Sequence, residues 1–296
     1  MKYPFEENLH DFYKYLLLGP LTIIYKARKE TQLEGFLAFS NLIIDKFAIH
    51  SSSFIHLSEG IIELKKNNEA VQMNGYDLFT VNTVFRTMME NYATFNHLFI
   101  EPKAIEEQKF RFLLWKIDGL YDKQRFDIGE TDLKEVKSTL ANDKKILIEV
   151  MNEFENSKFY SLLEKDQLIK IYNPDKKKFR WRFLLIEGKI LPLSITELIK
   201  HTCKTRAFIN HYRYSSIHTH TNYLSLEHFE LTRGKPISQQ YTNAITRLAI
   251  FLTSMLIFDI CSIDENAKNA FEYLPQNVKE YINGISIAIK NNKDSL

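Results

Sequence analysis

Nine consecutive residues, 212–220, combine side chains that could take part in acid–base chemistry. Their sequence, YRYSSIHTH, holds two tyrosines, two serines, two histidines and an arginine. The wider window, residues 198–226, has no acidic residue, and its basic and imidazole side chains are Lys200, His201, Lys204, Arg206, His211, Arg213, His218 and His220. A window of this composition could attract phosphate, unless acids on neighbouring helices, Glu90 among them, balance its charge.

Helical geometry divides these residues between two faces. If residues 206–224 form one helix, a turn of about 100° per residue places His211, Ser215, His218 and Asn222 on one face, with Tyr212 beside them. Arg213 and His220 then lie on another face. We therefore expect Tyr212, Ser215 and His218 to address one point, while Arg213 needs RNA or a second chain to reach it.

Each chemical interpretation of His218 has a structural alternative. A histidine beside a tyrosine and a serine suits general acid–base catalysis, but a buried histidine held by hydroxyl groups has the same sequence pattern. Ser215 near His218 suggests an activated nucleophile, although no nucleophile-elbow motif is present. His211, His218 or His220 could also bind a metal ion, but on a helix His218 and His220 point apart, and no carboxylate lies close in sequence.

A second candidate group lies on the segment 78–100, which contains no lysine. Arg86 and Glu90 are four residues apart and share a helical stripe with Asn82 and His97. We predict a polar pocket between this helix and the helix near 206–224. The catalytic candidates are Arg86, Glu90, Tyr212, Arg213, Ser215 and His218. The alternatives are an ion pair in solvent or a buried Arg–Glu pair that orders neighbouring helices.

A basic and aromatic stretch near residue 180 provides candidate nucleic-acid contacts. The basic residues Lys176, Lys177, Lys178, Arg180 and Arg182 alternate with rings at Phe179, Trp181 and Phe183. Charged groups with stacking rings suit single-stranded RNA or DNA. We include Trp181, Lys204 and Arg206 among the nucleic-acid-binding candidates. The alternative is a solvated lysine turn followed by a tryptophan bound in the core.

The elements that must position these residues are predicted to be mostly helices. The chain has 296 residues with only 9 glycines and 7 prolines, which favours long helices over many strands. We predict an all-α, bundle-like single domain over 1–296, whose C-terminal helices, 236–292, pack onto the rest. Helices are expected over 6–18, 33–66, 78–100, 103–122, 133–154, 158–171, 238–261, 266–273 and 276–290.

A few residues are expected to end, interrupt or begin the predicted helices. Gly19-Pro20 is expected to end the first helix. Residues 183–186 and 189–191 could pair as a small hairpin around Glu187-Gly188, within an irregular insert over 173–193. Ser194 and Glu197 have the spacing of a capping box, so a helix should begin there.

Composition predicts a soluble cytoplasmic protein that uses no membrane and no cofactor. The net charge is only +2, so attraction to nucleic acid would come from local patches. The two cysteines, Cys203 and Cys261, lack metal or disulfide spacing. The first residues are acidic and aromatic, unlike a signal peptide. The longest apolar run, residues 248–258, is too short to span a bilayer.

The pairing of Arg86-x3-Glu90 with Tyr212-x2-Ser215-x2-His218 resembles an uncharacterised bacterial all-helical family, a domain of unknown function. The resemblance covers about residues 40–230. It implies a helical fold and no established activity.

Arg213-x4-His218, and likewise Arg206-x4-His211, resemble the Arg-x4-6-His pattern of the HEPN ribonucleases and toxins. That resemblance implies a helical homodimer that cuts RNA without metal, with arginine and histidine from two protomers at one composite site. Arg213 would stabilise the phosphate, and His218 would handle the proton of the 2′-hydroxyl or of the leaving group. A tyrosine follows Arg213, where HEPN motifs favour a small polar residue.

Three functions therefore compete. The leading hypothesis is an RNA-directed protein, such as a metal-independent HEPN-like endoribonuclease of a bacterial defence or toxin system. The second is a non-catalytic helical binding or regulatory module, in which the same polar cluster is a buried structural network. The third is a metal-dependent hydrolase.

Overall fold

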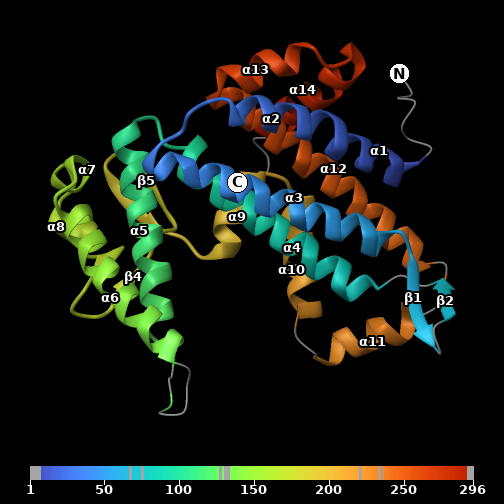
Figure 1. Cartoon of the computed structure of the whole chain (residues 1–296), viewed down its shortest axis with the longest axis horizontal. Helices are drawn as coiled ribbons and strands as arrows, with labels where there is room; N and C mark the ends of the chain where they lie inside the picture. The colour runs from blue at the N-terminus through green and yellow to red at the C-terminus, as the bar shows by residue number, and fades with distance from the viewer. Residues whose placement is uncertain are drawn as a thin grey trace. The chain divides into compact units, whose positions relative to one another are not determined.

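The computed structural model describes residues 8–66, 69–74, 77–126, 129, 134–219, 222–232, 235 and 237–291, most of them in helices (Figure 1). The chain is all-α in class, with three two-stranded antiparallel sheets among the described residues, and the predicted fold class is confirmed. Contacts divide the chain into two compact units: unit 1 is Met1–Asn96 with Ile199–Leu296, and unit 2 is His97–Leu198. The expectation of one domain over 1–296 stays a prediction.

The first helical segment of unit 1 continues through Gly19-Pro20, where the sequence predicted its end. Helix α1 (Leu9–Leu16) leads into the π-helix η1 (Leu17–Leu21), and α2 (Thr22–Lys29) follows directly. Pro20 has no N–H to donate. The wider turn compensates, because the Thr22 amide and the Thr22 hydroxyl both donate to the Leu17 carbonyl, the hydroxyl at 2.8 Å.

The long helix predicted over 33–66 is wrong at both ends. A 3₁₀ turn, η2 (Gly35–Ala38), leads into α3 (Phe39–Ser58). Gly60 then adopts a φ of +75°, the left-handed conformation that ends helices. The next residues form strand β1 (Ile61–Lys66), which pairs antiparallel with β2 (Glu69–Asn74). The apolar spacing continued past Gly60, and this concealed the change to an extended backbone.

Helix α4 (Leu78–Phe95) and the π-helical turn η3 (Asn96–Ile100) together confirm the helix predicted over 78–100. Asp77 caps α4 by accepting hydrogen bonds from the amides of Phe79 and Thr80. In unit 1, α4 packs against α3, α10 (Arg206–Thr219) and α12 (Ile237–Ile263). The centre of the unit therefore lies around α4.

The helix predicted over 206–224 is shorter than expected. It ends at Thr219, and α11 (Tyr223–Thr232) begins a new direction, with the Asn222 side chain accepting from the Ser225 amide at 2.9 Å. Asn222 therefore caps α11 instead of sharing a face with His218, so this part of the prediction is wrong. His220 lies outside the described residues.

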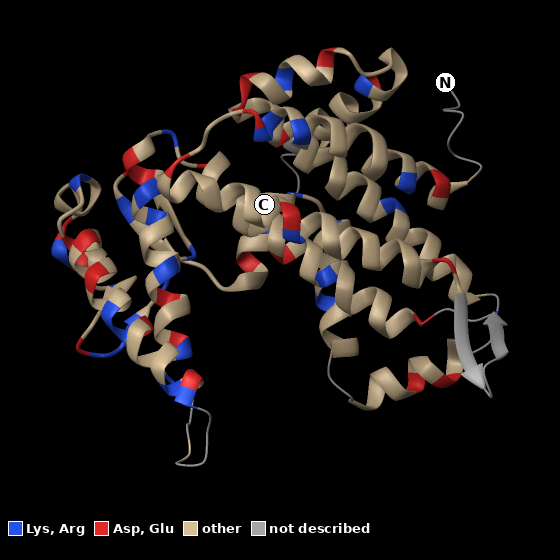
Figure 2. Ribbon diagram, in the orientation of Figure 1, with Lys and Arg blue, Asp and Glu red and all other residues tan. Residues whose placement is uncertain are grey.

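The C-terminal helices follow their predicted ranges closely: α12 is succeeded by α13 (Glu265–Glu272) and α14 (Gln276–Asn291). By length and composition α12 could cross a membrane, but most of its apolar window is buried, and it packs against α1, α4 and α14 as a core helix does. Figure 2 shows that α4 and α12 carry few charged residues, in contrast to α5 (Ile105–Lys123) and α6 (Lys134–Glu155) of unit 2.

Unit 2 holds helices α5 to α8 and two small hairpins. The helix predicted over 158–171 is instead two single turns, α7 (Lys158–Ser161) and α8 (Lys165–Leu168), because Glu164 between them has extended backbone. Strands β3 (Tyr172–Asn173) and β4 (Lys178–Phe179) pair, as do β5 (Phe183–Ile186) and β6 (Lys189–Pro192). The second hairpin turns at Glu187-Gly188 with φ of +51° and +75°, which confirms the predicted hairpin.

The capping box that opens α9 (Ile195–Cys203) is confirmed. The Ser194 hydroxyl accepts from the Glu197 amide at 3.2 Å, and the Glu197 carboxylate accepts from the Ser194 amide at 2.6 Å. Both bonds satisfy amides that a helix start leaves without partners.

Buried ionic groups order each unit. In unit 2, the Arg111 guanidinium donates to the carboxylates of Glu101 and Glu107 at 2.9 and 2.6 Å. In unit 1, Arg28 and Asp264 form an ion pair at 3.4 Å with side-chain exposures of only 3% and 2%. Asp264 also caps α13 by accepting from the Ala267 amide.

Replacing Asp264 with alanine is expected to lower the free energy of unfolding by about 3–5 kcal/mol, because it leaves Arg28 charged and buried. Urea denaturation measures the change. The matched control is Glu265→Ala, which removes an exposed carboxylate one residue away. Equal stability of the two variants would contradict a structural role for the buried pair.

Candidate functional site

The structure brings Arg86, Glu90 and Tyr212 together, as the sequence predicted. Arg86 Nε donates to Glu90 Oε1 at 3.0 Å, and Arg86 Nη2 donates to the Tyr212 hydroxyl at 3.2 Å. That hydroxyl in turn donates to Glu90 Oε1 at 2.7 Å. The Arg86 guanidinium carbon also lies 4.8 Å from the centre of the Tyr212 ring. A closed triangle of charge-assisted hydrogen bonds therefore joins α4 to α10.

The remaining Arg86 nitrogen completes this cluster. Nη1 donates to the Ser216 hydroxyl at 3.0 Å and to the Thr219 hydroxyl at 3.4 Å. All three guanidinium nitrogens thus have acceptors within the protein. The side chains of Arg86 and Glu90 keep 21% and 37% exposure, so the cluster reaches solvent at one edge. We call Arg86, Glu90, Tyr212, Ser216 and Thr219 the arginine cluster.

Ser216 and Thr219 were not among the predicted site residues. The sequence contains a usable signal, because both lie one helical turn from predicted members, at four residues from Tyr212 and from Ser215. Their hydroxyls also donate to the carbonyls of Tyr212 and Ser215 within α10.

The other two members of the predicted pocket lie apart from the arginine cluster. The Ser215 hydroxyl is fully buried and donates to Asn82 at 3.4 Å, so it is a link between helices. His218 is 8% exposed and packs edge-on against Phe79 and Tyr214. Neither of its ring nitrogens has a hydrogen-bond partner among the described residues.

His97, predicted to extend the Arg86 stripe, belongs instead to unit 2. It is fully buried and lies beside Arg111, whose Nη1 is 2.8 Å from His97 Nδ1, while His97 Nε2 is 3.0 Å from the Trp181 carbonyl. The same Nδ1 is also 2.8 Å from Glu101 Oε2, and burial lowers the pKa of His97 although the hydrogen bond to Glu101 opposes this. The π-turn η3 begins before His97, and the angle per residue of an ideal α-helix does not hold there.

Acid–base catalysis by the α10 side chains is disfavoured by their surroundings. Burial lowers the pKa of His218, and the neighbouring His228 adds to this effect. Burial and the hydrogen bond to Glu90 raise the pKa of Tyr212 to about 12. Both side chains are therefore neutral near pH 7, and His218 is enclosed by aromatic rings rather than aimed at solvent.

The residues of the HEPN-like pattern do not converge within one chain. Arg213 is exposed, whereas His218 on the same helix is buried. In the second match, Arg206 is exposed and His211 packs edge-on against Phe85 at 5.2 Å. Among the described residues, no group of three or more His, Cys, Asp or Glu side chains is placed to hold a metal ion.

The basic stretch near residue 180 divides between surface and core. Lys176, Lys177 and Arg180 are exposed, and Lys178 is half-buried. Trp181 is only 6% exposed, so the prediction that it stacks on nucleotide bases is wrong, and the alternative of a core tryptophan holds. In an extended backbone, successive side chains point to opposite sides. The basic side chains of this stretch therefore face outward, and the aromatic rings between them face inward. Lys204 and Arg206 belong to unit 1.

Arg180 and Arg182 line a cavity of about 380 Å³ together with Pro192, Leu193, Ser194 and Glu197. Arg182 Nε is buried without a hydrogen-bond partner among the described residues, and the charge of Arg182 acts on the Asp118 carboxyl and lowers its pKa against the effect of burial. The guanidinium carbon of Arg182 lies 5.0 Å from the centre of the Trp181 ring, which fixes its plane. We call this feature the arginine cavity.

Arg86→Ala is expected to lower the free energy of unfolding by about 1–3 kcal/mol, because it removes the guanidinium group that donates to both Glu90 and the Tyr212 hydroxyl. Chemical denaturation of Arg86→Ala measures this. Arg213→Ala, which removes an exposed arginine on α10, serves as the control and should change stability little. A larger loss in the control would contradict a structural arginine cluster.

The stability of the protein is expected to fall as the pH is lowered from about 6.5 toward 4. Burial, with a smaller contribution from His218, lowers the pKa of His211 to about 4. Above the unfolded-state pKa of about 6.5 both states are neutral. Below it His211 binds a proton in the unfolded chain but stays neutral in the folded chain, so a fall in pH favours unfolding.

Thermal unfolding at several pH values tests this expectation, with His211→Phe as the variant. The slope between pH 6.5 and 4 should be shallower in His211→Phe than in the wild type. His56→Gln, at an exposed histidine, should keep the wild-type slope. Identical slopes for wild type and His211→Phe would count against the buried neutral imidazole.

Comparison with family models, with curated proteins and with solved structures gave no match for this chain. The resemblances to a domain of unknown function and to the HEPN ribonucleases therefore stay predictions.

Proposed function

We propose that this chain is a non-catalytic, RNA-directed binding module that contacts phosphate through the arginine cavity of unit 2. The observation that carries the proposal is the pair Arg180 and Arg182, two guanidinium groups that line one hollow. Asp118 interacts electrostatically with Arg182 but forms no direct ion pair with it. The buried arginines Arg28 and Arg111 are instead paired directly with carboxylates.

The chemistry of the cavity fits a phosphodiester. A guanidinium group presents a planar fork of donors that matches two phosphate oxygens, and it loses little water on binding. Arg182 Nε is already out of contact with water in the folded protein, so a phosphate that binds there displaces no water from this donor. Glu197 is the one acid at the cavity, and its carboxylate accepts from the Ser194 amide in the capping box.

The exposed lysines extend this surface along the same segment. Lys176 and Lys177 occupy the turn between β3 and β4, where the Asn173 side chain accepts from the Lys176 amide at 3.1 Å. Because Trp181 is buried, the contacts would be to the backbone of the nucleic acid. The proposal therefore implies binding with little sequence preference and a strong dependence on salt.

A catalytic function has weaker support. The arginine cluster satisfies its own hydrogen bonds, and His218 is neutral and enclosed. An endoribonuclease of the HEPN type would need a second copy of the chain to place an arginine near a histidine that aromatic rings cover. The same residues suit a network that fixes α4 against α10.

Electrophoretic mobility shift with a labelled single-stranded RNA tests the binding proposal. The double variant Arg180→Ala/Arg182→Ala should weaken binding by at least tenfold, and the slope of log K against log salt should decrease by about 1 for each arginine that had neutralised a phosphate. The control Lys144→Ala/Lys145→Ala removes the same charge from exposed positions on α6 and should bind nearly as wild type does. Equal weakening in both variants, or no RNA binding by the wild type, would overturn the proposal.

The same preparation distinguishes binding from cleavage. RNA incubated with the wild-type protein in EDTA should remain intact, and His218→Ala should not change its length distribution. Cleavage that disappears in both His218→Ala and Arg213→Ala would reject the non-catalytic module and favour the HEPN-like nuclease.

A further inference from the structure

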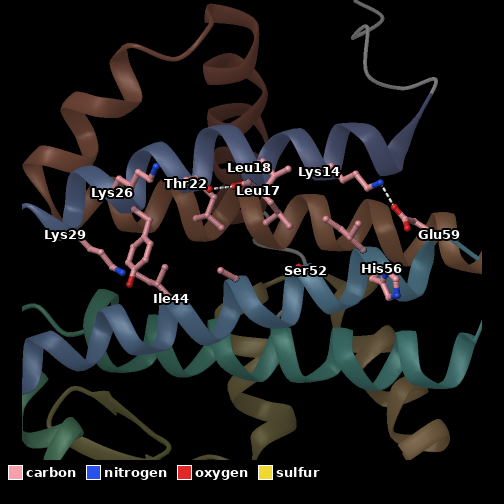
Figure 3. A pocket seen from close by; sticks show the side chains of 14 residues that line it. Lys14, Leu17, Leu18, Thr22, Lys26, Lys29, Ile44, Ser52, His56 and Glu59 are labelled. Atoms are coloured by element: carbon pink, nitrogen blue, oxygen red, sulfur yellow. Dashed lines mark hydrogen bonds and ion pairs between the residues drawn. The ribbon is translucent and has the colours of Figure 1, made fainter. Parts of the chain in front are cut away.

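An apolar groove lies in unit 1 between the segment α1–η1–α2 and helix α3, away from the arginine cluster. Its cavity volume is about 500 Å³. Figure 3 shows leucines of the π-turn facing the side chains of α3 across it. The apolar lining residues are Leu17, Leu18, Leu21, Ile44, Ala48 and Ile55.

The groove is built by the π-helical turn. An extra residue in the turn changes the register of the side chains that follow it, and such turns occur often at functional sites. Here Leu17, Leu18 and Leu21 all line the hollow, and Leu18 is left 77% exposed at its edge. The Thr22 hydroxyl, also on the wall, is already bonded to the Leu17 carbonyl, and Tyr25, Ser52 and His56 are further polar side chains of the lining.

Charge is distributed unequally along the groove. At one end Lys14 and Glu59 form an ion pair. At the other end lie Lys26 and Lys29 (Figure 3). The Lys29 ammonium is 3.8 Å from Asp45, and Lys26 has no ion-pair partner among the described residues. The groove therefore has an apolar middle, one neutralised end and one cationic end.

We propose that this groove binds a free single-chain fatty carboxylate. The carboxylate would lie at Lys26 and Lys29, and the aliphatic chain would run past Leu21 and Ile44 toward Ile55. A mainly apolar wall with a few polar or charged groups is the pattern of small-molecule sites, and the volume lies within their range of roughly 300–1,000 Å³. Charge complementarity selects an anionic head over a cationic one.

A partner helix is the competing occupant, and it would lay one apolar face into the groove through several side chains along its length. An extended alkyl chain can follow the hollow along its length. This inference is independent of the proposed RNA binding, which concerns unit 2.

Isothermal titration calorimetry with dodecanoate, below its micelle concentration, tests the proposal on the full chain. We expect saturable binding at one site. Lys26→Glu should weaken binding at least tenfold, whereas Lys46→Glu, at an exposed lysine of α3 outside the groove, should change it less than twofold. Leu18→Asp should weaken binding similarly, and Leu42→Asp, at another exposed leucine, should not. Circular dichroism confirms that each variant is folded.

Two further ligands separate the contributions of head and tail. Hexanoate should bind much more weakly, because it buries less of the apolar wall, and dodecyltrimethylammonium should bind more weakly because its head has the wrong charge. The proposal is overturned if dodecanoate gives no saturable heat, if the cationic amphiphile binds as tightly as dodecanoate, or if Leu18→Asp and Lys26→Glu bind as the wild type does.

Discussion

Helix α4 is packed against α3, α10 and α12, and a helix surrounded in this way must find a partner for each polar side chain that it buries. Tyr92 and Asn96 meet this constraint at the buried Asp259 of α12, at 2.8 and 3.0 Å. Arg86 meets it at Tyr212 and Ser216 of α10. These bonds join segments far apart in sequence, so they specify which helices surround α4 as well as stabilising them.

The same requirement distinguishes charged side chains that are bonded within the fold from charged side chains that are free to bind a ligand. The guanidinium groups of Arg28, Arg86 and Arg111 have hydrogen-bond acceptors within the fold. A partnered group of this kind gains little from a ligand, since binding would first break bonds already made. Arg182 in unit 2 and Lys26 in unit 1 lack such partners among the described residues, and each lines a hollow. These two hollows therefore hold the cations that are available to a ligand, whereas the residues that look most reactive in the sequence are engaged within the fold.

Periodicity predicted the fold class, most helix ranges, the hairpin near residue 187 and the convergence of Arg86 and Glu90 with Tyr212. These succeed because apolar spacing and i,i+4 geometry are local properties. Asn222 and His97 were misplaced, because a helix end and a π-turn depart from the constant angle of an ideal α-helix. Trp181 was misassigned because a ring beside basic residues has the same pattern on a surface strand as at a core boundary. His218 lies near α4 as predicted, but it packs among aromatic rings and not in a polar pocket. Residue spacing alone does not distinguish these two surroundings.

Pro20 connects a local backbone requirement to the shape of unit 1. A helix that ended at Gly19-Pro20 would provide no continuous wall opposite α3, and Ile44, Ala48 and Ile55 would need another cover from solvent. The π-turn keeps the segment helical by letting Thr22 supply both of its donors to Leu17. The wall then continues into α2, which brings Lys26 to the end of the leucine-lined surface. The missing backbone donor of Pro20 and the hollow between the helices therefore have the same structural origin. Apolar periodicity predicts neither of them, because it interprets proline only as the end of a helix.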